Sequence, residues 1–245
     1  PPPIPAGLAI PEVVVDLPPP EVNEDLPTVP LATAAAPLAP VRSSGPDESD
    51  PGHDIFGPDV PVFGFSVDLG ELGSTDVLDD LSAPAAREAV HRAIVEAVDA
   101  LAPIERDELC KLIARRFGLS RVRADRVASI AALVPAAWVR TGNLGCFVWP
   151  PNLDPDSWDG FRRNVNGDTP RRLPEVAPEE IRNAMVECVR QGIEVREAEM
   201  FELVAKLFGH ERQTDAVKQR LSAVALWSVD TRRLTQADDG SYRLA

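Results

Sequence analysis

The pattern of apolar and polar positions is written twice along this chain. Residues 112–118 read LIARRFG and residues 203–209 read LVAKLFG, 91 positions later. The same offset relates further apolar positions on both sides of this segment: Val90 with Ile181, Ile94 with Met185, Val98 with Val189, and Ile130 with Leu221. Matches that keep the register of a helix over this distance indicate one structural unit present in two copies.

Each copy predicts three helices followed by a β-hairpin. In the first copy the helices are expected at 84–101, 106–117 and 121–134, where apolar residues recur at helical spacing. Gly118 stands where helices end, and Ser120 where the third helix would be capped. Short β-prone runs at 138–139 and 147–149 flank turn residues. This order is typical of the winged helix. The expected fold class is mainly α with small β-hairpins, as two tandem winged-helix-like units at 84–150 and 177–245.

Charge separates these units from the segment that precedes them. The 245 residues carry a net charge of −14 and 25 prolines. Residues 1–83 hold 15 acidic residues, one basic residue (Arg42) and 16 of the prolines, whereas 84–245 hold 24 acidic and 24 basic residues. High charge with little apolar surface predicts a disordered, Pro-rich acidic linker at 1–83. Within it, 60–67 alternates so that Phe63, Phe65 and Val67 share one face, which predicts a short strand that packs nearby or docks a partner.

Between the two copies lies a connector, 151–176, which we expect to be ordered. Trp158 and Phe161 are three residues apart, and aromatic side chains in a Pro-rich connector usually anchor it to a neighbouring surface. Stacking on nucleobases is the alternative for these two rings.

Candidate catalytic chemistry is sparse. Cys146 and Cys188 are possible nucleophiles and His91 and His210 possible bases, but none has a partner at a diagnostic spacing. Three scattered cysteines without a C-x-x-C pair indicate reduced thiols rather than disulfides or zinc. No metal site, cofactor or small-molecule substrate is expected, and we predict that the chain is not an enzyme. The absence of an apolar run of about 20 residues predicts no membrane span. Reduced thiols favour a cytoplasmic location. The missing initiator Met predicts a fragment of a longer protein.

A series of short motifs then resembles a known family. It comprises Trp158-x-x-Phe161-Arg162, Arg172, APEEI at 177–181, and LVAKLFG at 203–209. Together they resemble a bacterial C-terminal domain of unknown function that ends very large proteins with a superfamily I helicase motor and a restriction-endonuclease-like domain. The resemblance covers roughly 90–245. It implies that the partners are upstream helicase and nuclease-like domains of the same polypeptide. The Walker motif and the nuclease Asp…Glu-x-Lys cluster are absent from the sequence, so neither activity is expected of this piece itself.

Two functions remain open at this stage. One is an accessory module that positions DNA weakly and non-specifically through basic residues of the third helices and the connector. The residues proposed for this contact are Arg121, Arg123, Arg126, Arg162, Arg163, Arg171, Arg172, Arg212, Lys218 and Arg220. The neutral charge of 84–245 argues against a strong, free-standing DNA-binding protein. The alternative is a structural or protein–protein interaction module that makes no contact with nucleic acid.

Overall fold

A computed structural model of the protein describes residues 56, 60, 61, 69–164, 169–192 and 194–245. Contacts divide the chain into two units, Pro1–Val41 and Arg42–Ala245, and every described residue belongs to the second. The expected mainly helical fold with small antiparallel sheets is confirmed for these residues. Most of the predicted linker, including Phe63, Phe65 and Val67, lies outside them, so its disorder stays a prediction there. The last part of that linker, residues 69–83, is described and contains the helix Asp76–Asp79 with the buried Leu78, so the expected disorder is wrong for this part.

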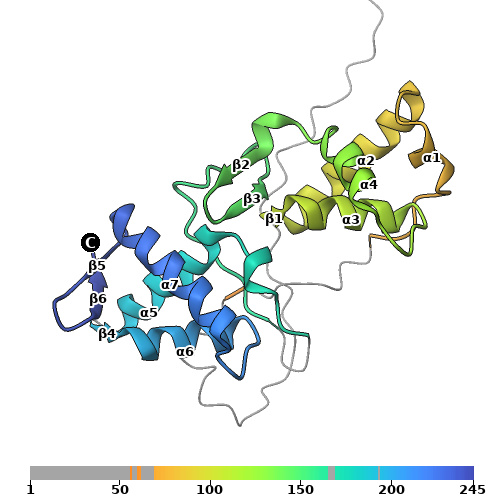
Figure 1. Cartoon of the computed structure of the whole chain (residues 1–245). Coiled ribbons are helices and arrows are strands. Elements are labelled where there is room, and N and C mark those ends of the chain that lie inside the picture. The colour runs from red at the N-terminus through yellow and green to blue at the C-terminus, as the bar shows by residue number, and fades with distance from the viewer. Residues whose placement is uncertain (1–55, 57–59, 62–68, 165–168, 193) are drawn as a thin grey trace, which may run out of the picture. The chain divides into compact units, whose positions relative to one another are not determined.

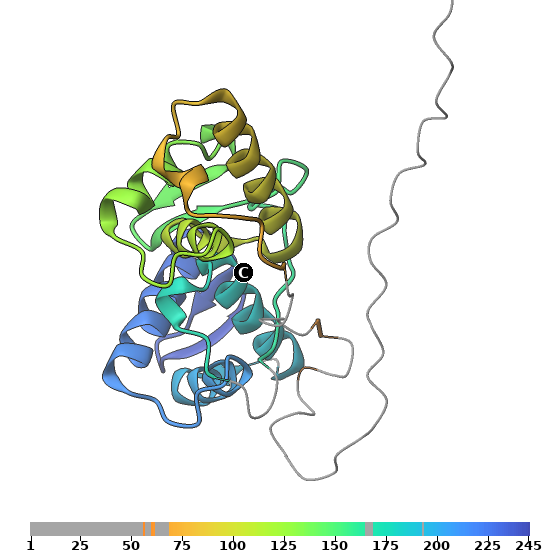
Figure 2. The ribbon, with the colours of Figure 1, turned by 90° about the vertical axis from the view of Figure 1, so that its right-hand side faces the viewer.

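The first copy follows a short helix α1 (Asp76–Asp79). The first copy consists of α2 (Pro84–Leu101), β1 (Ile104–Glu105), α3 (Arg106–Arg116), α4 (Ala124–Ala131), the 3-10 turn η1 (Ala136–Trp138), β2 (Val139–Gly142) and β3 (Gly145–Val148). The strands form an antiparallel sheet in the order β1-β3-β2. Its register pairs Ile104 with Val148 and Val139 with Val148. In Figures 1 and 2 this copy is coloured from yellow to green.

The second copy repeats the same order of elements. It consists of α5 (Pro178–Gly192), β4 (Val195–Arg196), α6 (Glu197–Leu207), α7 (Asp215–Asp230), β5 (Leu234–Gln236) and β6 (Ser241–Leu244). Its sheet has the order β4-β6-β5, which is the order of the first sheet with each strand replaced by its counterpart. The connector carries a second 3-10 turn, η2 (Leu173–Glu175). Figures 1 and 2 draw this copy from cyan to blue.

Strands β1 and β4 were not predicted, because two residues are too few to show a β alternation. The third helix of the first copy is also shorter than the predicted 121–134. It begins after Arg123, which takes the extended conformation of an N-cap, rather than after Ser120. The predicted end of α3 at Gly118 is confirmed, and α6 ends in the same way. Gly118 and Gly209 follow these helices at φ +85° and +88°, a backbone region that L side chains avoid.

Each copy has a hydrophobic core of its own. The first is formed by α1 to α4 and Val148, and the second by α5 to α7 with their sheet. Three connector residues, Phe161, Leu173 and Val176, are buried in the second core. Described residues near the N-terminus pack on it as well, since Phe56 meets the ring of Phe161 edge-on at 5.6 Å. The connector therefore packs into the second copy's core through Phe161, Leu173 and Val176.

Helix α5 is enclosed by these additions. All residues from 178 to 185 are buried, whereas its counterpart α2 exposes residues such as Arg87, Glu88 and Arg92 to solvent. A third, smaller apolar cluster of Phe147, Trp149 and Ala177 lies where the first copy's hairpin leads into the connector. The two copies thus share a sequence pattern but differ in which faces remain accessible.

Candidate nucleic-acid interface

The N-terminal end of α4 carries the most accessible of the predicted basic residues. Arg121 and Arg123 are exposed on the loop that leads into this helix. Neither guanidinium has a hydrogen-bond or ion-pair partner within the described ranges. Arg126, one turn later, is bound to Asp79 of α1, with Nη2 2.9 Å from the carboxylate. Two cations therefore remain available at the N-terminal end of α4, where the helix dipole places a partial positive charge.

A groove runs beside this helix on the side of α3. Its volume is about 670 Å³, and its α4 wall is formed by small apolar residues, Ala124, Ala128, Ala131 and Ala132. The α3 wall carries Arg106 and Lys111. Both are already paired with acids of their own helix, Arg106 with Asp107 at 3.0 Å and Lys111 with Glu108 at 2.6 Å. The groove is accessible, but its polar groups are largely neutralised.

The corresponding helix of the second copy is held by its surroundings. Arg212 and Lys218 are exposed, but Arg220 of α7 turns inward and is half-buried. Its guanidinium donates hydrogen bonds to the backbone carbonyls of Leu144 (2.7 Å), Val176 (3.0 Å) and Leu173 (3.2 Å). Burial lowers the pKa of this arginine. Arg220 thus binds α7 to the connector and to the first copy's hairpin, and its donors are not available to a phosphate.

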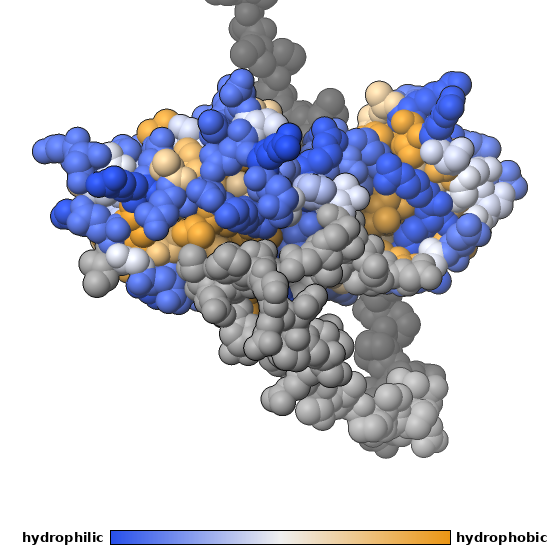
Figure 3. Space-filling model, turned by 90° about the horizontal axis from the view of Figure 1, so that it is seen from below, coloured by the Kyte–Doolittle hydropathy of each residue, from blue (hydrophilic) through white to orange (hydrophobic). Residues whose placement is uncertain are grey.

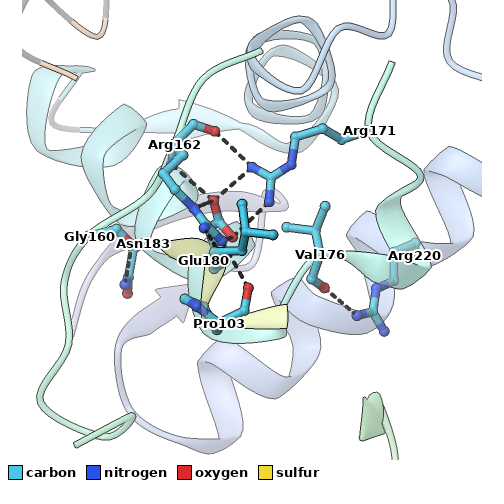
Figure 4. Close-up of polar contacts among 9 residues, drawn as sticks. Pro103, Gly160, Arg162, Arg171, Val176, Glu180, Asn183 and Arg220 are labelled. Atoms are coloured by element: carbon cyan, nitrogen blue, oxygen red, sulfur yellow. Dashed lines mark hydrogen bonds and ion pairs between the residues drawn. The ribbon is translucent and has the colours of Figure 1, made fainter. Parts of the chain in front are cut away.

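Two connector arginines have the same kind of role. Arg162 and Arg171 both bind the carboxylate of Glu180, which is fully buried in α5 (Figure 4). Arg171 Nη1 and Nη2 lie 2.7 Å and 3.0 Å from its two oxygens. Arg162 approaches with Nε at 3.0 Å and Nη2 at 2.7 Å. We call these three side chains the Glu180 cluster.

The Glu180 cluster also joins the two copies. Arg162 Nη1 donates to the carbonyl of Leu101 at 2.7 Å and Nη2 to that of Pro103 at 3.0 Å, both just after α2. Burial alone would raise the pKa of Glu180, but the two guanidinium groups outweigh it and lower the pKa to about 2. The predicted DNA contact by Arg162, Arg171 and Arg220 is therefore replaced by an internal role.

The remaining connector arginines are nearer the surface. Arg172 is exposed and forms an ion pair with Glu175. Arg163 is half-buried, and its backbone N–H donates to the carbonyl of Pro61 at 2.9 Å. On the face shown in Figure 3, hydrophilic residues are interspersed with smaller apolar areas. The predicted basic path along the connector is therefore broken by buried and acid-paired residues.

A sequence signal for the internal role existed in the repeat itself. At the 91-residue offset, Glu180 corresponds to Ala89 and Arg220 to Ser129. Both charged residues thus stand at positions where the other copy has a small side chain. A charged residue at a position where the other copy has a small one indicates a partner of opposite charge that the other copy lacks. For Glu180 these partners are Arg162 and Arg171, which come from the connector and have no counterpart in the repeat.

The four candidate catalytic residues are not brought together. His210 Nε2 contacts the carbonyl of Arg171 at 2.8 Å, and Cys146 Sγ contacts Thr141 Oγ1 at 3.3 Å. Cys188 is buried, and burial raises the pKa of its thiol to about 12. His91 lies beside the Trp138 ring, with centroids 6.3 Å apart. In the part of the chain that the structure covers, none of the four hydrogen-bonds to another.

Metal and membrane sites are also not found among the described residues. No cluster of three or more His, Cys, Asp or Glu side chains there could hold a metal ion. None of the helices described has the length and apolar character that crossing a bilayer requires. In comparisons with known proteins, no family model, curated protein or solved structure matches the chain.

Proposed function

We propose that the two copies are tandem winged-helix units and that the first positions nucleic acid through the loop and N-terminal turn of α4. The observation that carries this proposal is the exposure of Arg121 and Arg123, without acidic partners in the described structure, at the start of the third helix. In winged helices this is the element that enters a groove of DNA. The order of helices and strands and the β1-β3-β2 sheet support the assignment to that fold.

The second copy has a different role in this proposal. Its third helix and the first copy's hairpin are tied together by Arg220, and α5 is enclosed by the connector. These contacts give the second copy the role of a rigid structural support rather than of a second unit that contacts nucleic acid. They also favour the alternative function, a structural or interaction module for neighbouring domains, because half of the predicted basic residues bind other groups of the protein itself.

The expected binding is weak and non-specific. Residues 84–245 hold equal numbers of acidic and basic residues, so no long-range field draws DNA to them. With two or three phosphate contacts, the logarithm of affinity falls against the logarithm of salt concentration with a slope of about −2 to −3. Such contacts suit a module attached to a protein already on DNA. The resemblance to the C-terminal domain of helicase–nuclease proteins supports this placement in a cytoplasmic, ATP-dependent enzyme, with no catalysis by this chain.

The test is fluorescence anisotropy of labelled single- and double-stranded 20-mers with the full chain at about 50 and 200 mM salt. Arg121→Ala/Arg123→Ala is compared with Arg87→Ala/Arg196→Ala, which removes two exposed arginines elsewhere. The first variant should lose about tenfold in affinity and about two units of salt slope. The control should stay within about twofold. Absence of wild-type binding, or equal losses in both variants, would refute the proposal and favour the interaction module.

A further inference from the structure

The segment that precedes the first copy, residues 69–80, is held beside the end of α3 where the loop to α4 begins. The backbone carbonyl of Arg116 accepts a hydrogen bond from the Leu72 N–H at 2.8 Å, and its guanidinium donates to two further carbonyls of the segment. A Cβ added to Gly118, which opens the loop, would lie 3.7 Å from the Thr75 side chain. Residues 69–80 therefore lie against the loop that carries the exposed arginines.

This segment, which we call the acidic flank, carries charge of one sign. It contains four acidic residues and no lysine or arginine, and the acidic residues are Glu71, Asp76, Asp79 and Asp80. All four are exposed, whereas Leu78 between them is buried in the core of the first copy. The acidic flank is thus fixed by an apolar anchor, and its carboxylates stay accessible to solvent and to α4.

One of these carboxylates already binds a residue predicted to contact nucleic acid. Asp79 Oδ1 accepts a hydrogen bond from Arg126 Nη2 at 2.9 Å. Arg126 lies in the first turn of α4, and the N-terminal residues of this helix are those that contact DNA in related folds. A carboxylate and a phosphate bind a guanidinium through the same charge-assisted hydrogen bonds. Asp79 therefore occupies Arg126 as a phosphate would.

The repeat indicates that the fold does not require this ion pair. In the second copy a connector segment lies against the glycine that follows the second helix, where an added Cβ would be 3.1 Å from the Pro170 Cα. At the 91-residue offset, Asp79 corresponds to Pro170 and Arg126 to Val217. Each copy thus has a segment packed at this glycine, but only the first has an acid and an arginine at these two positions.

We propose that the Asp79–Arg126 ion pair is an autoinhibitory contact, in which the acidic flank competes with nucleic acid for an arginine of α4. This inference rests on the proposed function of that helix. The pair is open to exchange, because the side chain of Asp79 is 67% exposed and that of Arg126 is 27% exposed, and exposed pairs contribute little to stability. Arg121 and Arg123 then contact nucleic acid directly, and Arg126 does so only after Asp79 has been displaced.

The experiment repeats the anisotropy measurement with the full chain, a labelled double-stranded 20-mer and the variant Asp79→Asn. Asparagine keeps the shape of the side chain but removes the charge that holds Arg126. Binding should become about fivefold tighter at about 50 mM salt, and the salt slope should steepen by about one unit, because one more phosphate is contacted. Asp76→Asn is the matched control, since it removes an equal, exposed charge from the same helix. It should change the affinity by no more than about twofold.

A double variant connects the gain in affinity to Arg126. In Asp79→Asn/Arg126→Ala, the tighter binding and the additional salt slope of Asp79→Asn should both disappear. A gain that persists without Arg126 would show that only the overall charge matters, and would overturn the proposal.

Thermal unfolding separates the autoinhibitory contact from a purely structural ion pair. Asp79→Asn should keep the thermal midpoint within about 3 °C of wild type, because the pair is exposed. A lower midpoint together with unchanged affinity would assign the pair the role of fastening α1 and would overturn the proposal.

Two outcomes distinguish this inference from the proposed function. Equal binding by Asp79→Asn and Asp76→Asn, with the loss in Arg121→Ala/Arg123→Ala intact, would refute the autoinhibitory contact and leave the proposed function standing. Retention on a heparin column needs no nucleic acid, since heparin presents anionic groups without bases. Elution of Asp79→Asn at higher salt than Asp76→Asn would support the contact even if no oligonucleotide bound, and elution at the same salt would count against it.

Discussion

Replacing Glu180 by glutamine removes the negative charge that Arg162 and Arg171 share inside the protein. The carboxylate is fully buried, and Arg171 is only 3% exposed. Glutamine keeps the shape but presents an amide donor to guanidinium groups that are themselves donors. Removing one partner of a buried ion pair leaves an uncompensated charge and costs about 3–5 kcal/mol. The backbone carbonyls that also accept from Arg162 do not replace the lost charge.

The pKa of Glu180 gives a second estimate of the stability that this charge contributes. Its pKa falls from an unperturbed 4.5 to about 2. At about 1.4 kcal/mol for each pKa unit, the ionised form stabilises the fold by about 3 kcal/mol. Because the folded pKa is the lower one, this contribution is fully present above the unfolded pKa of 4.5 and is lost as pH falls through about 2. The two routes agree in size.

The assay is urea unfolding of wild type and Glu180→Gln, followed by tryptophan fluorescence and circular dichroism. The midpoint should fall by roughly 2 M urea, given a slope of about 2 kcal/mol per M. The difference between the two proteins should shrink by roughly 1 kcal/mol between about pH 7 and about pH 3.5.

A matched control comes from the same region of the chain. Glu175→Gln removes the partner of Arg172, whose side chain is 74% exposed, and should cost at most about 1 kcal/mol. Equal losses in the two variants, or a Glu180→Gln effect that does not change with pH, would refute the reasoning about the buried charge.

Two further predictions use matched positions. Gly209→Ala should destabilise the protein by about 1–2 kcal/mol more than Gly118→Ala in thermal unfolding. Both glycines have positive φ, but only at Gly209 would an added Cβ clash with Asn164 and lie 3.1 Å from the Pro170 Cα. Equal losses of stability in the two variants would show that the steric clash at Gly209 does not contribute. In Ellman's assay near pH 8, Cys146 should react first, because burial raises the pKa of the other two thiols to about 12. Three thiols reacting at one rate would contradict the burial.

The sequence alone determined the repeat, and through it most of the fold. Helical periodicity places α2, α3 and their counterparts, because the apolar face of a helix must be buried wherever the helix lies. Gly118 and Gly209 could be predicted as helix ends because the requirement for positive φ is local. The two-residue strands β1 and β4 could not, because a strand of that length is defined only by the partner that it pairs with.

Only the tertiary structure decided which arginines are available to a ligand. Arg121 and Arg162 look alike as sequence letters, yet one is exposed and the other is held by Glu180 and two backbone carbonyls. The reason is that burial of a charge depends on partners far away in the chain, which local periodicity does not encode. The same holds for Arg126, whose partner Asp79 lies 47 residues earlier in the chain.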